Sequence, residues 1–96
     1  MEAVVRTYSG KGAKELFELI ESRKSEVEKI MRSVKGFVSY TLVRTGDGGL
    51  SITICKDKAG VDESVQVAKD WIAKNAGHTG ASAPKVSTGS VILHMK

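Results

Sequence analysis

The 96-residue sequence predicts a single α+β domain, residues 1–96, in which helices cover one face of a four-stranded antiparallel sheet. Two long segments repeat apolar residues at the i, i+3, i+4 and i+7 positions of an amphipathic helix. Four shorter segments alternate apolar and polar residues, or are rich in β-branched residues, as strands do. A glycine-rich turn joins the second and third of them directly, so the expected order is β-α-β-β-α-β.

The first two elements are a short strand and a long helix. Residues 3–8 are rich in β-branched side chains, and the glycines of residues 9–12 suit a strand-to-helix turn. A helix is expected over residues 13–34, with Gly36 placed to end it. Its apolar stripe consists of Ala13, Leu16, Phe17, Ile20, Val27, Ile30, Met31 and Val34. Arg23 and Lys24 interrupt the stripe, so we expect either that their long side chains reach the rim of the core or that a cation faces a pocket.

The middle of the chain predicts a β-hairpin. Residues 37–44 alternate, with Val38, Tyr40 and Leu42 on one face and Phe37, Ser39, Thr41 and Val43 on the other. Asp47 and Gly48 tolerate the positive φ of a tight turn. The returning strand, residues 50–56, alternates Leu50, Ile52 and Ile54 with Ser51, Thr53 and Cys55.

The last part of the chain predicts a second helix and a final strand. The helix runs from Val61 or Asp62 to about Ala76, and Gly77 is its expected C-terminal cap. Its inward stripe is formed by Val61, Val65, Ala68 and Ile72. A loop of small residues follows, and residues 86–95 alternate as a strand.

This order corresponds to a ferredoxin-like sandwich, because right-handed crossovers place both helices on the same face of the sheet. The other face is left bare. Since apolar residues occur on both sides of the strands, we expect two copies to pair through their open sheet faces as a homodimer. The alternative is a wettable open face built from small polar residues, namely Ser39, Thr41, Ser51, Thr53 and Cys55.

Charge and composition exclude several classes of partner. The net charge is +4, but basic and acidic residues are interleaved, as on a solvated helix face, so no nucleic-acid partner is expected. The third strand carries no aromatic residue, which argues against an RNA recognition motif of the same topology. No apolar run is long enough for a membrane span, and the N-terminus has no signal-peptide pattern. With a single cysteine, these features predict a cytoplasmic protein.

Two stretches, residues 34–75 and 83–94, resemble the antibiotic-biosynthesis-monooxygenase-type family, whose members form dimeric α/β barrels from two ferredoxin-like subunits. The likeness lies in the Gly36-Phe37 start of the second strand and the charged segment after the third. It continues in the Trp71-Ile72 pair and in the small residues that lead to the last strand. The resemblance implies a dimeric α/β barrel and possible cofactor-independent oxygenase activity.

The catalytic patterns of that family are incomplete here. Some cofactor-free members place an Asn one helical turn before the Trp, whereas this chain has Val67 there and Asn75 one turn after Trp71. Heme-degrading members combine an Asn on the first strand with the Trp and a later His. The first strand of this chain has no Asn, and His78 comes too soon. We therefore predict no cofactor, and two isolated histidines without a carboxylate at ligand spacing predict no metal.

What remains is a candidate pocket lined by Tyr40, Trp71, Asn75 and His78, in which a small aromatic ligand stacks on the indole. Residues 78–84 would act as a mobile lid over it. The simpler alternative is that Trp71 only packs and that Asn75 and His78 only finish a helix. Two functions stay open: a homodimer that binds a hydrophobic or aromatic metabolite, with oxygenase activity possible, or a non-catalytic binding or stress-response module. Whether the chain is an enzyme is left undecided.

Overall fold

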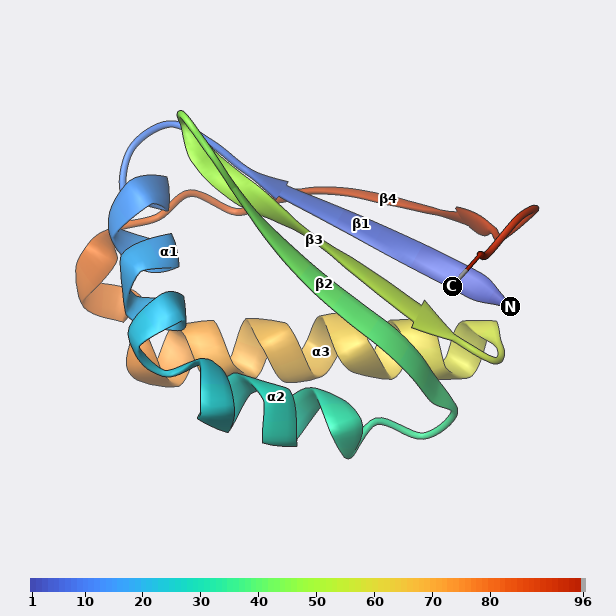
Figure 1. Cartoon of the computed structure of the whole chain (residues 1–96). Coiled ribbons are helices and arrows are strands. Elements are labelled where there is room, and N and C mark those ends of the chain that lie inside the picture. The colour runs from blue at the N-terminus through green and yellow to red at the C-terminus, as the bar shows by residue number, and fades with distance from the viewer. Residues whose placement is uncertain (96) are drawn as a thin grey trace.

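The computed structural model describes residues 1–95 and confirms the predicted α+β class. Its elements follow in the order β1 (Glu2–Tyr8), α1 (Ala13–Ser22), α2 (Lys24–Arg32), β2 (Phe37–Thr45), β3 (Gly48–Cys55), α3 (Lys58–Asn75), the short 3-10 helix η1 (Gly77–Thr79) and β4 (Lys85–Ser90). The helices lie together beneath the sheet (Figure 1).

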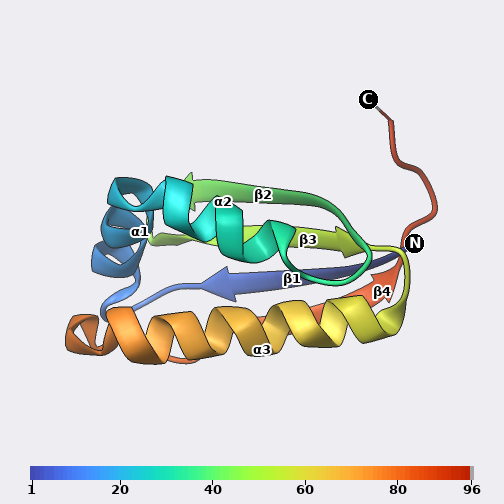
Figure 2. The same ribbon diagram turned by 90° about the horizontal axis from the view of Figure 1, so that it is seen from below.

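The four strands form one antiparallel sheet in the order β2-β3-β1-β4, which confirms the predicted ferredoxin-like arrangement. Seen from below, α1, α2 and α3 all lie in front of the same sheet face (Figure 2). The opposite face carries no helix of the described residues. In the same part of the chain, no helix is both long and apolar enough to cross a membrane.

The prediction of one helix over residues 13–34 was wrong, because the chain breaks into α1 and α2 at Arg23. Arg23 leaves helical geometry at φ −124° and ψ 29°, and the two helices run in different directions (Figure 1). The break coincides with the interruption of the apolar stripe. Each helix can then turn its own apolar residues to the core, Leu16, Phe17 and Ile20 from α1 and Val27 and Met31 from α2.

The second predicted helix begins earlier than expected and ends differently. Asp57 caps α3, and its carboxylate accepts a hydrogen bond of 3.1 Å from the backbone N–H of Gly60. Gly77 is not the C-terminal cap, because Ala76 takes that position and Gly77 starts η1. The left-handed residue comes later, at Gly80, with φ 69°.

The last strand is shorter than predicted. β4 ends at Ser90, which pairs with Glu2 at the start of β1, so residues 91–95 have no further stretch of β1 beside them. The backbone N–H of Val91 donates a final hydrogen bond to the carbonyl oxygen of Met1. Beyond this point Ile92, Leu93 and Met95 are exposed, and the segment leads away from the sheet (Figure 2).

Some side chains of the hairpin strands lie on a different face from the one that simple alternation predicts. A bulge between Phe37 and Ser39 shifts the pairing, so Phe37 faces Cys55 and Tyr40 faces Thr53. Ser51, Thr53 and Cys55 are buried toward the helices. Leu50, Ile52 and Ile54 therefore lie on the open face, which is the reverse of the wettable face considered above. We call the helix-covered side the inner face and the other side the open face.

Candidate ligand site

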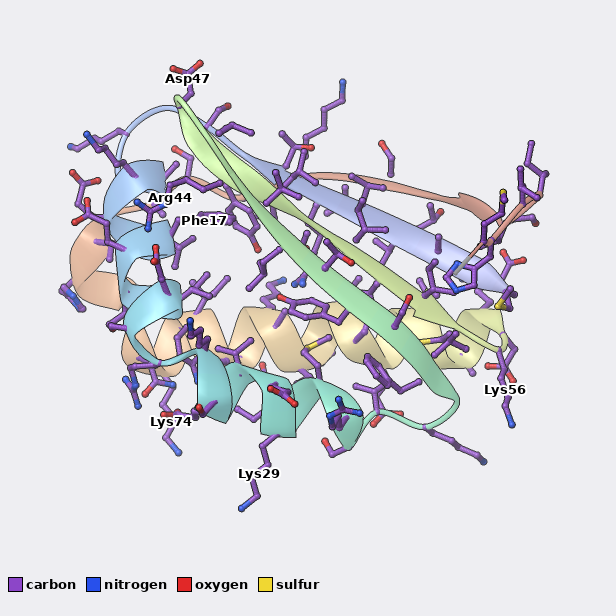
Figure 3. All side chains as sticks on the ribbon, viewed as in Figure 1. Phe17, Lys29, Arg44, Asp47, Lys56 and Lys74 are labelled. Carbon is purple, nitrogen blue, oxygen red and sulfur yellow. The ribbon has the colours of Figure 1, made fainter. Side chains whose placement is uncertain are left out.

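A small cavity lies between the inner face of the sheet and the three α-helices, with a volume of about 30 Å³. This is space for about one or two water molecules. Its walls are largely apolar, and Figure 3 shows Phe17 reaching from α1 toward the sheet, whereas Lys29 and Lys74 point away from it. The lining residues are Arg6, Tyr8, Phe17, Ile20, Val27, Ile30, Met31, Tyr40, Leu42, Ser51, Val67, Ala68, Trp71 and Ile72.

Arg6 is the charged residue of this lining. It lies on the inner face of β1 between the buried Val4 and Tyr8, and only 3% of it is exposed. Its strand partner across the β1–β3 ladder is Ser51, and Arg6 Nε donates a hydrogen bond of 3.1 Å to Ser51 Oγ. No acidic side chain within residues 1–95 forms an ion pair with it.

Sequence reasoning did not single out Arg6. A signal was present, because the alternation of the first strand places Arg6 in the same set of positions as Val4 and Tyr8. A cation in the buried set of a short strand indicates either an internal partner or a ligand.

Two phenols accompany Arg6 in the cavity lining. Burial raises the pKa of Tyr40, and the positive charge of Arg6 partly opposes that rise. Burial likewise raises the pKa of Tyr8, against the same opposing charge. Both groups therefore stay protonated at neutral pH and can donate hydrogen bonds. The hydroxyl oxygen of Thr53, the strand partner of Tyr40, is buried without a hydrogen-bond partner.

Trp71 lines the cavity from α3, but its polar edge is used elsewhere. The indole Nε1–H donates a hydrogen bond of 2.9 Å to Glu26 Oε1 on α2. Arg23 completes this group, because its guanidinium pairs with Glu26 at 2.7 Å and lies 5.5 Å from the indole centroid. The indole thereby ties α3 to α2, and only its apolar surface is left for the cavity.

The structure separates the other two predicted site residues from this cavity. Asn75 Nδ2 donates a hydrogen bond of 3.0 Å to the backbone carbonyl of Trp71, one turn earlier on α3. Asn75 and Trp71 share a different, open depression near Glu26 and Lys74. His78 lies exposed in η1. Tyr40 and Trp71 are therefore brought together on the inner cavity, whereas Asn75 and His78 do not line it.

A larger cleft of about 440 Å³ opens beside the inner cavity, between α3 and the segment that leads into β4. Three residues, Arg6, Tyr8 and Ile72, line both spaces and so form the wall between them. The rest of the cleft is lined by Val65, Lys69, Ala73, Ala81, Ser82, Ala83, Pro84 and Val86. Residues 81–84, part of the predicted lid, thus form one wall of the cleft.

The comparison with known proteins places this geometry in a fold family. No family model and no curated protein matches the sequence. A protein of unknown function from Nitrosomonas europaea aligns with a TM-score of 0.71 at 12% identity, over 99% of this chain and 91% of that chain. A monooxygenase from the gene ActVA-Orf6 of Streptomyces coelicolor, in complex with the ligand nanaomycin D, aligns with a TM-score of 0.65 at 18% identity, over 99% and 89%.

SnoaB, a cofactor-independent oxygenase from Streptomyces nogalater, also aligns with a TM-score of 0.65 at 18% identity, over 98% of this chain and 95% of its own. At such identities the likeness establishes the fold alone. The resemblance to antibiotic-biosynthesis-monooxygenase-type proteins is thus confirmed as a ferredoxin-like fold shared over nearly the whole chain.

Proposed function

We propose that this protein binds a small hydrophobic or aromatic metabolite between the inner face of its sheet and α3. The observation that carries the proposal is the inner cavity, where apolar walls and the aromatic rings of Tyr8, Tyr40 and Trp71 surround the buried Arg6. Small-molecule sites are typically concave and apolar with few polar groups of this kind. The Streptomyces coelicolor monooxygenase of the same fold is in complex with the ligand nanaomycin D, which supports a small-molecule ligand for this fold.

The inner cavity forms the closed end of the proposed site, and the cleft forms its mouth. At about 30 Å³ the inner cavity admits no aromatic ring as it stands, whereas the cleft of about 440 Å³ is of the size that ligands occupy. A ligand would enter along residues 81–84 and press against the shared wall. Displacement of Ile72 and Tyr8 would then join the two spaces and bring a ring to the apolar surface of Trp71.

The second part of the proposal is a homodimer that forms through the open face. Ala3 and Val5 of β1 lie beside Ile54 and Ile52 of β3 on that face, with no helix of residues 1–95 over them. Val43 of the neighbouring β2 is 40% exposed. An apolar sheet face of this kind is stabilised when a second copy covers it.

Binding without catalysis is favoured over oxygenase activity by the groups that line the inner cavity. Arg6, Tyr8 and Tyr40 can all donate hydrogen bonds, but neither a carboxylate nor an imidazole of residues 1–95 is in the lining. A substrate that needs a general base would find none at hand. Cofactor-independent oxygenase activity, as in SnoaB, remains the alternative for a substrate that is already ionised when it binds.

Tryptophan fluorescence tests this proposal directly, because Trp71 is the single tryptophan of the chain. We expect saturable quenching when naphthohydroquinone or a similar quinol is titrated, and no comparable effect from a polar sugar of similar size. Oxygen uptake measured on the same mixtures separates the two functions: binding without oxygen uptake supports the non-catalytic protein. If neither quinols nor heme quench the indole at saturation, the proposed site is refuted.

A further inference from the structure

We infer that the ligand of this site carries an anionic group, a carboxylate on an apolar body, and that Arg6 binds it. The inference rests on the proposed function, since it names the class of ligand for the same site. Within residues 1–95, no acidic side chain forms an ion pair with Arg6. Only 3% of Arg6 is exposed to solvent, yet its near neighbours Ser51 and Tyr40 offer neutral oxygen atoms.

A buried cation without an anion is unfavourable, because the interior replaces the water that solvated it with weaker partners. Neither the inner cavity nor the cleft has an Asp or Glu among its lining residues. Two acidic side chains of the neighbouring helices, Glu26 and Glu21, are paired with Arg23 and Arg44 instead. A bound anion would therefore supply the charge that the fold omits.

The geometry of Arg6 suits a carboxylate. Its Nε–H is already used in the hydrogen bond to Ser51 Oγ on the inner face. The remaining donors are the N–H groups on Nη1 and Nη2, one of which the neutral Tyr40 hydroxyl shares. A carboxylate can take the place of that neutral partner, because its two oxygens match the paired N–H groups. Arg6 also lines the cleft, so an anion bound there can extend its body into this larger space.

The cleft selects for an organic acid over an inorganic anion. Val65, Ile72, Ala73, Pro84 and Val86 give it apolar walls, which would gain from burying a hydrocarbon or aromatic body. Lys69, exposed at the edge of the cleft, adds a second positive charge that attracts anions from solution.

A matched pair of probes tests the inference with the intact protein: cinnamate, an aromatic carboxylate, and cinnamyl alcohol, which has a neutral hydroxyl in its place. Calorimetric titration at neutral pH should show cinnamate binding at least about tenfold more tightly, as expected for a charge-assisted hydrogen bond in a buried site. Equal binding of both probes would overturn the inference and leave the proposed function intact. Failure of both to bind, together with no quenching by quinols, would overturn both.

Two variants distinguish the effect of Arg6 on cinnamate binding from the effect of positive charge near the cleft in general. Arg6→Met should bring the affinity for cinnamate down to that for cinnamyl alcohol, while Lys69→Gln should keep most of the preference because its charge is exposed and screened. Circular dichroism verifies that Arg6→Met is folded. If it is not, Arg6→Lys keeps the charge without the paired N–H groups and should retain only part of the preference. An unchanged preference in Arg6→Met, or its loss in Lys69→Gln alone, contradicts the assignment.

Discussion

At the scale of single residues, Trp71 shows how one side chain serves two purposes. Its indole N–H is bound by Glu26 on α2, and Arg23 completes the group from the break between α1 and α2. The hydrogen bonds from Trp71 and then from Arg23 lower the pKa of Glu26 below its ordinary value of 4.5. The apolar surface of the same indole lines the inner cavity. Trp71 can therefore hold α3 against α2 and line the proposed site at the same time.

This arrangement predicts a pH-dependent contribution to stability. The pKa of Glu26 is lowered in the folded state. The stabilisation that the ionised carboxylate gives to the fold is therefore fully present above pH 4.5, and it is lost as the pH falls through the lower pKa of the folded state. Glu26→Gln should therefore reduce the free energy of unfolding at neutral pH, and the difference from wild type should shrink below pH 4.5. Urea unfolding at several pH values measures this.

A double-mutant cycle identifies the cause. Trp71→Phe removes the indole donor, so Glu26→Gln should have a smaller effect in that background than in the wild type. An undiminished effect of Glu26→Gln in the Trp71→Phe background would mean that the indole hydrogen bond does not stabilise the carboxylate.

At the scale of elements, the order of strands and helices followed from periodicity, because each element has one face toward a common core. The break at Arg23 was visible only as a gap in the apolar stripe, and its consequence depended on how α1 and α2 pack against the sheet. The bulge after Phe37 and the inward Ser51 and Thr53 could not be deduced, since both faces of the hairpin carry apolar residues. Which face of the hairpin is buried depends on how the complete sheet packs against the helices.

The same dependence on the packed structure explains which residues of the candidate site could be predicted from the sequence. Tyr40 and Trp71 were expected to face a pocket because large aromatic residues on amphipathic elements point inward, and both line the inner cavity. Asn75 and His78 were placed with them by helical spacing, but α3 ends at Asn75 and the next residues turn into η1. Arg6 was missed because a cation was not expected among buried positions.

The start of α3 gives an element-scale prediction. Asp57 accepts the Gly60 N–H and so satisfies one of the free donors at the first turn. Asp57→Ala should lower the free energy of unfolding by about 1 kcal/mol. Asp57→Asn, which retains a capping oxygen, should lose much less in the same denaturant titration. Equal losses in the two variants would show that the cap itself does not stabilise the helix.

At the scale of the whole molecule, the two faces of the sheet have different proposed functions. The inner face holds Arg6 and the proposed ligand, whereas the open face is apolar at its centre, where Val5 and Ile52 pair across β1 and β3. The proposed homodimer follows from the open face, and the proposed ligand follows from the inner one.

The dimer is tested by adding a charge to the open face. Ile52→Lys should shift sedimentation from a dimer to a folded monomer of 10.3 kDa at micromolar concentration, because an unpaired ammonium would be buried between the two sheets. Gln66→Lys adds the same charge on the exposed side of α3 and should leave the dimer intact. Wild-type protein that sediments as a folded monomer would refute the proposed dimer.

We propose above that the ligand binds on the inner face with its anionic group at Arg6. The most direct measurement is a crystal structure of the protein with cinnamate. We expect the carboxylate to lie beside the Nη atoms of Arg6, with the ring where the cleft meets the inner cavity, in the space that displacement of Tyr8 and Ile72 opens toward Trp71. Cinnamate bound on the open face, or bound in the cleft with its carboxylate turned away from Arg6, would contradict it.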